Sequence, residues 1–179
     1  MGFLDKLLKK ESQTVQDKTS DSNHHAEPMK ETIYAFVSGE LVDIKKVPDE
    51  MFAAEMLGKS VAIEPTDNVI KAPCKGTVIT VFDTKHAIGI STEQGVELLL
   101  HIGINTVDLK GEYFQVFVKE GDIVEAGQKI AEVDMDQVRE KGYPAVTMLI
   151  ITNSDDYKDF NVTEPQIVEG TEVVMTVLK

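Results

Sequence analysis

The sequence contains very little of three things on which many protein functions depend: cysteine, arginine and long apolar runs. Cys74 is the only cysteine among 179 residues, so the chain forms no internal disulfide and fits a reducing compartment. Arg139 is the only arginine and the formal net charge is −13, which argues against nucleic acid, because phosphate binding requires clustered basic side chains. No apolar run approaches the roughly 20 residues of a membrane span, and the N-terminus lacks the pattern of a secretory signal. We therefore expect a cytoplasmic protein that binds no nucleic acid.

The first ten residues, MGFLDKLLKK, separate into an apolar and a charged arc when they are placed at helical spacing. The apolar arc contains Phe3, Leu4, Leu7 and Leu8. Three lysines and one aspartate give residues 1–10 a net charge of +2, opposite in sign to the rest of the chain. This contrast suits an anionic lipid surface, so the segment predicts peripheral contact with the inner face of the membrane. A frayed terminus is the alternative, because ten residues rarely hold a helix alone in water.

Residues 11–31 are polar, with almost no apolar side chains to bury, and are expected to form a flexible tether. His24 and His25 lie in this stretch without organised neighbours, so we interpret them as solvated. The folded domain is expected to span residues 32–179.

Beyond Thr32 the sequence is typical of short β-strands. Runs rich in Val, Ile and Thr are broken by turn-forming residues about every 8 to 12 positions, as in sandwiches and barrels. Two short helices are predicted, one between Asp49 and Gly58 and one between Asp134 and Gly142. We therefore expect a mainly all-β fold, an antiparallel β-sandwich or barrel with two or three short helices.

A weak internal repeat accompanies this pattern. Residues 35–44, AFVSGELVDI, and residues 72–81, APCKGTVITV, share Ala, Gly and an apolar alternation at an offset of 37. If the repeat is genuine, two related β motifs pack together with pseudo-symmetry.

His101 lies within an aliphatic run, GVELLLHIGINTV, at residues 95–107. The preceding sequence predicts a hairpin with one strand over residues 78–91 and a second over residues 96–102. If facing residues have numbers that sum to 187, His86 lies directly opposite His101, with Cβ atoms about 5 Å apart. A slip of one residue would place the two histidines on opposite faces of the sheet.

Strand alternation then assigns neighbours to the two histidines. Phe82 and Thr84 are expected on the same face as His86, and Leu99 on the same face as His101. The opposite face of the second strand is the natural core side, so His101 faces outward among apolar residues. Such a surface is typical of a site where another protein docks.

The residues alone leave three interpretations of the histidine pair open. The pair could be structural, or it could be half of a zinc site, although Glu97 is the only obvious carboxylate on that face for a third ligand. Alternatively, a neutral imidazole nitrogen is a nucleophile near pH 7 and can accept a phosphoryl group. The second imidazole, Thr84 and backbone N–H groups around Gly103 would then donate hydrogen bonds to the phosphoryl oxygens. The lack of an arginine clamp suits a carrier that hands the group on.

The run at residues 95–107 resembles the active-site signature of the glucose-class enzyme IIA family of the bacterial sugar phosphotransferase system, and every position fits. Residues 32–179 are identified as a type 1 enzyme IIA domain of this family, because further stretches are similar to family blocks in the same order. These stretches are SGELVDIKKVPDEMFAAEMLGKSVAIEP, APCKGTV, VFDTKHAIGI, VDLKGEYF and VKEGDIVEAGQKI. The N-terminal segment and tether are also similar to those of a stand-alone member, where the segment is associated with the membrane surface.

The resemblance implies a phosphoryl carrier that accepts its group from the phosphocarrier protein HPr and passes it to a cysteine of a IIB domain for glucose-type sugar uptake. It also implies a β-sandwich of duplicated halves, and no cofactor or metal of the chain's own. By matching positions, His101 is the phosphorylated nucleophile, His86 the supporting histidine and Thr84 the hydroxyl that orients it. The family's apolar docking surface matches Phe52, Phe82, Leu99 and Val107.

Other classes of protein fit less well. A biotinyl or lipoyl carrier needs a modifiable lysine in Met-Lys-Met or Asp-Lys-Ala, and neither occurs. A zinc peptidase of related fold needs an aspartate where Asn105 stands, and a P-loop needs a glycine where Ala53 stands. A non-catalytic interaction domain that retains the fold is the remaining alternative.

Overall fold

The computed structural model describes residues 29–179. The expected membrane-contacting segment, residues 1–10, and the first part of the expected tether, residues 11–28, lie outside the described residues. The first strand, β1 (Lys30–Tyr34), begins two residues before the expected domain boundary at Thr32. Within residues 29–179, no helix is long and apolar enough to cross a membrane.

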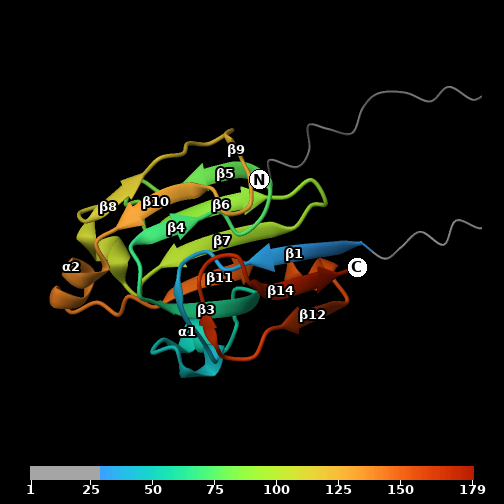
Figure 1. Cartoon of the computed structure of the whole chain (residues 1–179), viewed down its shortest axis with the longest axis horizontal. Coiled ribbons are helices and arrows are strands. Elements are labelled where there is room, and N and C mark those ends of the chain that lie inside the picture. The colour runs from blue at the N-terminus through green and yellow to red at the C-terminus, as the bar shows by residue number, and fades with distance from the viewer. Residues whose placement is uncertain (1–28) are drawn as a thin grey trace, which may run out of the picture.

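Antiparallel sheets form most of the described fold (Figure 1). The largest sheet has eight strands in the order β13-β2-β3-β11-β7-β6-β5-β9. Its strands are β2 (Gly39–Val42), β3 (Lys59–Pro65), β5 (Gly76–Val81), β6 (Ala87–Ser91), β7 (Glu97–Ile102), β9 (Ile123–Val124), β11 (Thr147–Ile151) and β13 (Ile167–Val168). The predicted mainly-β, antiparallel fold class is confirmed.

Two three-stranded sheets complete the fold. One has the order β1-β14-β12, and the other has the order β4-β10-β8. Their remaining strands are β4 (Val69–Lys71), β8 (Phe114–Val116), β10 (Lys129–Val133), β12 (Asp159–Val162) and β14 (Val173–Leu178). Side chains from all three sheets meet in one main core, where Ile33 of β1, Leu100 of β7 and Ile130 of β10 are fully buried.

The strand order confirms the duplication that the internal repeat predicted. The half β13-β2-β3-β11 of the large sheet mirrors the half β9-β5-β6-β7, and β2 and β5 start at Gly39 and Gly76, 37 residues apart. Both glycines are required by close packing, because a Cβ at Gly39 would overlap the Glu64 carbonyl and one at Gly76 would lie 2.7 Å from the Ser91 carbonyl.

Aspartates cap both short helices, as the sequence predicted. Asp49 accepts hydrogen bonds from the first backbone N–H groups of α1 (Glu50–Ala53), and Asp134 does the same for α2 (Met135–Glu140). Helix α2 ends near Gly142 as expected, whereas α1 ends at Ala53 and not at Gly58. The early stop coincides with Glu55, which has a left-handed φ of 51° and binds the Ser60 N–H with its carboxylate.

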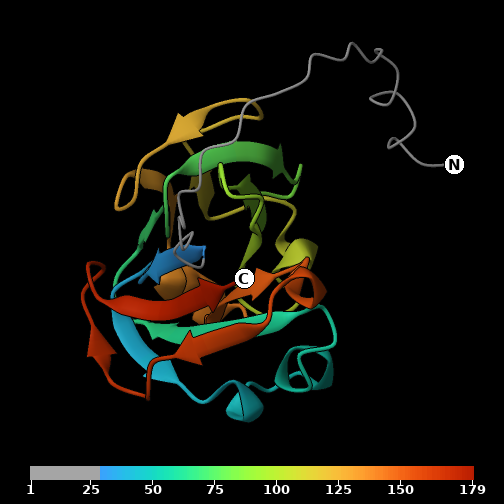
Figure 2. The same ribbon diagram turned by 90° about the vertical axis from the view of Figure 1, so that its right-hand side faces the viewer.

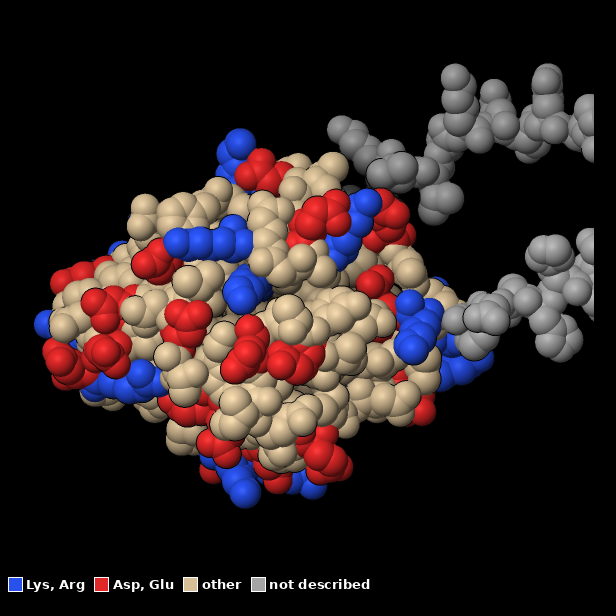
Figure 3. Space-filling model, viewed as in Figure 1, with Lys and Arg blue, Asp and Glu red and all other residues tan. Residues whose placement is uncertain are grey.

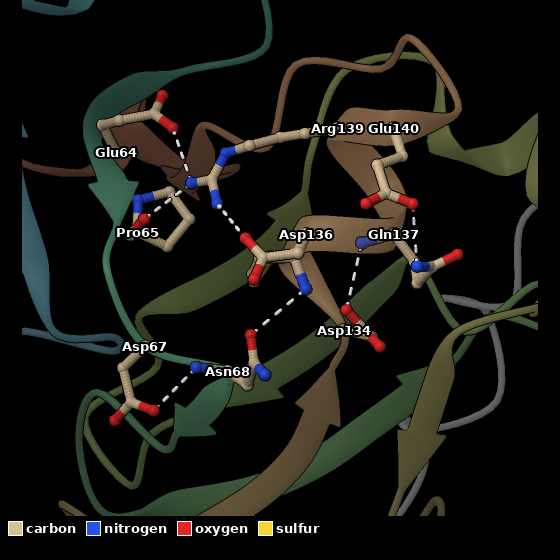
Figure 4. A network of polar contacts seen from close by, with 10 residues as sticks. Glu64, Pro65, Asp67, Asn68, Asp134, Asp136, Gln137, Arg139 and Glu140 are labelled. Atoms are coloured by element: carbon tan, nitrogen blue, oxygen red, sulfur yellow. Dashed lines mark hydrogen bonds and ion pairs between the residues drawn. The ribbon is translucent and has the colours of Figure 1, made fainter.

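The single arginine ties α2 to the end of β3 (Figure 4). Its guanidinium Nη2 donates to Glu64 Oε1 at 3.0 Å and to the Pro65 carbonyl at 2.7 Å. The Asn68 side-chain oxygen accepts from the Met135 N–H at the start of the same helix. Arg139 is thus engaged in holding the fold together.

The outer face of the large sheet, opposite the main core, carries a second and smaller apolar cluster. Ala62, Met148 and Ile150 are fully buried there beneath Val47 and Phe52. The covering residues belong to the connection between β2 and β3, which contains the 3₁₀-helix η2 (Ile44–Lys46) and α1. Figure 2 shows this connection at one end of the molecule and the strands β5 and β9 at the opposite end.

Candidate active site

The register of the β6–β7 hairpin differs by one residue from the prediction. Ala87 lies opposite His101, and the Ile102 N–H donates to the His86 carbonyl at 2.8 Å, so facing residues have numbers that sum to 188. The predicted long first strand is also wrong, because β5 ends at Val81 and β6 begins at Ala87 after a turn in which Lys85 has a φ of 59°.

The two histidine rings nevertheless meet. Their centroids are 5.0 Å apart and the ring planes are nearly perpendicular, at 83°. His86 precedes the first residue of β6 and follows the left-handed Lys85, so strict strand alternation does not govern the direction of its side chain. In a regular hairpin, a one-residue shift in register would place the two histidines on opposite faces. Here the turn at Lys85 directs the His86 side chain towards His101.

Thr84 and Phe82 both contact His86, as expected. Neither lies in a strand: Thr84 is in the turn between β5 and β6, and Phe82 is the first residue after β5. Thr84 Oγ1 and His86 Nδ1 share a hydrogen bond of 2.7 Å. The Phe82 ring lies edge-on to the His86 ring with centroids 5.5 Å apart. The side chain of His86 is therefore fixed on two sides.

The backbone at Gly103 fixes the ring of His101. His101 Nδ1 lies 2.9 Å from the Gly103 carbonyl oxygen, and a carbonyl can only accept a hydrogen bond. Nδ1–H is therefore the donor, and the lone pair of the neutral ring is on Nε2. Gly103 thus presents its carbonyl to the ring. Of the backbone N–H groups near Gly103 that are expected to donate to phosphoryl oxygens, that of Ile104 donates to the Pro144 carbonyl.

Only glycine fits this position without a shift in the backbone. Gly103 has a φ of +74°, and a Cβ there would overlap the methyl group of Thr106. Thr106 is itself fully buried, and its hydroxyl donates to the Ile102 carbonyl. The buried Thr106 side chain and its hydrogen bond therefore fix the conformation of the loop that follows β7.

Both histidines favour the neutral form. Burial, reinforced by the charge that His86 would carry, lowers the pKa of His101 to about 4, against the opposing effects of the Gly103 carbonyl and the Asp49 carboxylate. Burial also lowers the pKa of His86, which is only 7% exposed. A neutral imidazole with a lone pair on Nε2 is the form in which histidine acts as a nucleophile.

Two residues that act on His101 were not predicted to do so. Phe52, expected as a docking residue, is 8% exposed and packs on the His101 ring with centroids 4.8 Å apart. Asp49 caps the helix that carries Phe52 and favours protonation of His101 through its charge. The capping pattern around Asp49 was visible in the sequence, but its proximity to His101 depends on the packing of α1.

The remaining expected docking residues are exposed to different extents. Phe82 and Val107 are exposed, at 42% and 44%, whereas Leu99 is half-buried on β7, two residues before His101. Val107 belongs to the 3₁₀-helix η3 (Thr106–Leu109), which follows Gly103. Met51, beside Phe52 on α1, adds another exposed apolar side chain.

Two features of the described residues bear on small ligands. Residues 29–179 contain no group of three or more His, Cys, Asp or Glu side chains placed to hold a metal ion. A surface pocket of about 320 Å³ lies between η2, the start of β3 and residues 162–165, and it includes none of the predicted site residues.

The lowered histidine pKa values predict a loss of stability in acid. An unfolded histidine titrates near 6.5, so between about pH 6.5 and pH 4 the unfolded chain binds more protons than the folded chain. The stabilisation from neutral His101 is complete above pH 6.5 and is lost as the pH falls towards 4. We expect the wild type to lose about 2 to 3 kcal/mol more unfolding free energy across this range than His101→Gln, as measured by urea denaturation. Equal pH dependence of the two proteins would contradict the lowered pKa.

Comparison with known proteins agrees with this geometry. Residues 31–157 match the family described as phosphoenolpyruvate-dependent sugar phosphotransferase system, EIIA 1. The glucose-specific EIIA component of Halalkalibacterium halodurans is 47% identical over 138 residues, covering 77% of this chain and 80% of that protein. The glucose-specific EIICBA component of Staphylococcus saprophyticus is 40% identical over 173 residues, which are 96% of this chain but 25% of that larger protein.

A solved structure extends the similarity to the fold. The glucose permease IIA from Mycoplasma capricolum superposes with a TM-score of 0.76 and is 36% identical, covering 83% of this chain and 96% of that one. The family match includes both histidines and Thr84, and the region from β1 to the 3₁₀-helix η4 (Ser154–Asp156). The chain belongs to the EIIA 1 family of the phosphoenolpyruvate-dependent sugar phosphotransferase system.

Proposed function

We propose that the chain is a cytoplasmic phosphoryl carrier, which accepts a phosphoryl group from phospho-HPr on Nε2 of His101 and passes it to the cysteine of a IIB domain during uptake of a glucose-type sugar. The observation that carries the proposal is the pair of imidazoles 5.0 Å apart, with Nδ1 of His101 held by the Gly103 carbonyl. Membership of the EIIA family supports the same role.

The uptake step follows from the state of His101. At pH 7 the ring is neutral, because its pKa is lowered to about 4, and Nδ1–H is held by Gly103. The Nε2 lone pair attacks the phosphorus of phospho-HPr, a new N–P bond forms, and the N–P bond of the donor breaks with its electrons returning to the donor nitrogen. No proton has to leave His101, since its only N–H proton stays on Nδ1.

His86 acts on the phosphoryl group in this proposal. If the Thr84 hydroxyl donates the 2.7 Å hydrogen bond to His86 Nδ1, the neutral ring of His86 carries its proton on Nε2. That N–H then donates to a phosphoryl oxygen and stabilises charge that develops during onward transfer. The IIB cysteine thiolate attacks the phosphorus, and the N–P bond to His101 breaks with its electrons returning to Nε2.

The partners are proposed from the relatives and from the surface. The names EIICBA and EIIBCA join EIIA to EIIB in one chain in Staphylococcus saprophyticus and Bacillus subtilis, which supports a IIB domain as the acceptor. The exposed side chains of Phe82, Val107 and Met51 offer an apolar surface beside the histidines for the donor and the acceptor in turn.

An intact-mass assay tests the proposal. Incubation with enzyme I, HPr and phosphoenolpyruvate should add one acid-labile phosphoryl group, and omission of HPr should prevent the addition. A chain that gains no phosphoryl group with all components present would instead be a non-catalytic interaction domain of the same fold.

A further inference from the structure

The two halves of the large sheet are related in fold but not in how their outer faces are covered. At the offset of 37 residues, Ile79 on β5 is the counterpart of Val42 on β2. Val42 pairs with Ala62 on β3, whereas a register shift between Val78 and Thr80 leaves Gly89 on β6 paired with Thr80 and beneath Ile79. In the first half, residues 43–58 connect β2 to β3 and cover this face with η2 and α1. In the second half, the connection between β5 and β6 is only residues 82–86, which is too short to do the same.

The difference leaves Ile79 open on the second half. Ile79 is 43% exposed although its side chain lies over Gly89, whereas its counterpart Val42 packs against the cluster beneath α1. Beside Ile79, Ile123 on the edge strand β9 is 70% exposed, as its counterpart Ile167 on β13 also is, at 69%. Ile123 pairs with Thr77, two residues before Ile79 and on the same face of β5. Leu99, half-buried against the cluster beneath α1, pairs with Gly89 and borders this surface on the side of His101. We call Ile79 and Ile123 the open patch.

We propose that the apolar arc of residues 1–10 of the same chain docks on the open patch. On the covered half, the short helix α1 packs its aromatic residue, Phe52, on the equivalent surface. A short amphipathic segment with an aromatic side chain therefore fits this kind of surface. The sequence of residues 1–10 offers the same chemistry in Phe3, Leu4, Leu7 and Leu8.

The chain enters the domain close to the open patch. Glu31, near the start of β1, accepts a hydrogen bond from Thr92 and senses the charge of Glu93, so it lies beside the turn between β6 and β7. From the end of β6 at Ser91, Ile123 is two strand spacings away, about 10 Å. If residues 11–28 form the flexible tether that their composition predicts, their typical end-to-end distance is roughly 25 Å, which is enough to span this separation.

Charge and tethering both favour this occupant. Residues 1–10 carry a net charge of +2, and acidic side chains are spread over the face of the molecule that Figure 3 presents. Asp122 and Glu125 flank β9 directly, each in an ion pair with a lysine, and Glu120 lies two residues before Asp122. With the tether that the composition of residues 11–28 predicts, the effective concentration is in the mM range, so an intrinsic dissociation constant of about 1 mM is enough for substantial docking.

Docking would place residues 1–10 beside the histidines. Leu99 is two residues from His101, and Phe82, three residues after Ile79, contacts His86. If the proposed function holds, the docked segment competes with HPr and the IIB domain for this surface. The docking itself requires neither partner, so it can be tested when no phosphoryl transfer takes place.

Methyl NMR of the isoleucine-labelled full chain tests the docking. We expect the Ile79 and Ile123 methyl signals to shift between the wild type and a Leu4→Ser/Leu7→Ser variant, at low protein concentration and without lipid. Ile167 is the matched control, because it is 69% exposed on β13, the counterpart of β9, and its signal should stay in place. In the reverse direction, Ile123→Ser should shift the methyl signals of Leu4 and Leu7 in a leucine-labelled chain.

Three results would overturn the proposal. Identical Ile79 and Ile123 signals in the two proteins would show that the segment does not dock, even if it binds anionic vesicles when they are added. Shifts that Ile167 shares would indicate a nonspecific effect. Shifts that grow with protein concentration would assign the open patch to a second copy of the chain.

Discussion

His101→Gln is expected to take up no phosphoryl group when it is incubated with enzyme I, HPr and phosphoenolpyruvate, whereas the wild type takes up one. Glutamine retains a polar side chain of similar length but has no nitrogen lone pair that can act as a nucleophile. The loss should be complete, because in the proposed arrangement His86 carries its proton on Nε2 and so presents no nitrogen lone pair to the phosphorus. Intact-mass measurement of the two proteins, side by side, checks the prediction.

A folding control is needed because the His101 ring packs on Phe52 at 4.8 Å. Far-UV circular dichroism and the unfolding midpoint of His101→Gln should match the wild type at pH 7, where both proteins are uncharged at this position. A folded His101→Gln that still gains an acid-labile phosphoryl group would disprove the role of His101.

His86→Gln is expected to separate the two transfer steps. Uptake on His101 should persist within about tenfold, because the lone pair on His101 Nε2 is set by the Gly103 carbonyl and not by His86. Transfer to a IIB domain should fall by about 10² to 10³-fold, the usual loss when one donor to a developing charge is removed. Single-turnover rates of phosphoryl gain from phospho-HPr and of loss to IIB measure the two steps separately.

Thr84→Val provides the matched variant for His86. It keeps the shape of the threonine but removes the hydroxyl at 2.7 Å from His86 Nδ1, so it should impair onward transfer in the same direction and to a smaller extent. Equal losses in uptake and transfer for His86→Gln would show that His86 supports the fold of the site and does not act on the phosphoryl group.

The sequence predicted the fold class well because strand-forming runs and turn residues are local signals. The capping aspartates of both helices and the repeat at Gly39 and Gly76 were also correct for that reason. The early end of α1 was not predictable, since it depends on the carboxylate of Glu55 reaching the Ser60 N–H on β3.

The sequence predicted which residues lie together at the site better than it predicted how they are arranged. The pairing of His86 and His101 was expected from a register that is wrong by one residue, and the rings meet because the turn at Lys85 redirects His86. The orientation of the Gly103 carbonyl depends on a φ of +74° and on packing against Thr106, which no spacing pattern shows. Turn conformation and packing from distant elements therefore set the geometry that periodicity cannot supply.

The most direct test of the central claim is phosphorus–nitrogen correlation by NMR on the phosphorylated chain with ¹⁵N-labelled histidine. We expect one phosphorus signal coupled to Nε2 of His101, with Nδ1 of the same ring still protonated and bonded to the Gly103 carbonyl. Coupling to His101 Nδ1, or to either nitrogen of His86, would contradict it.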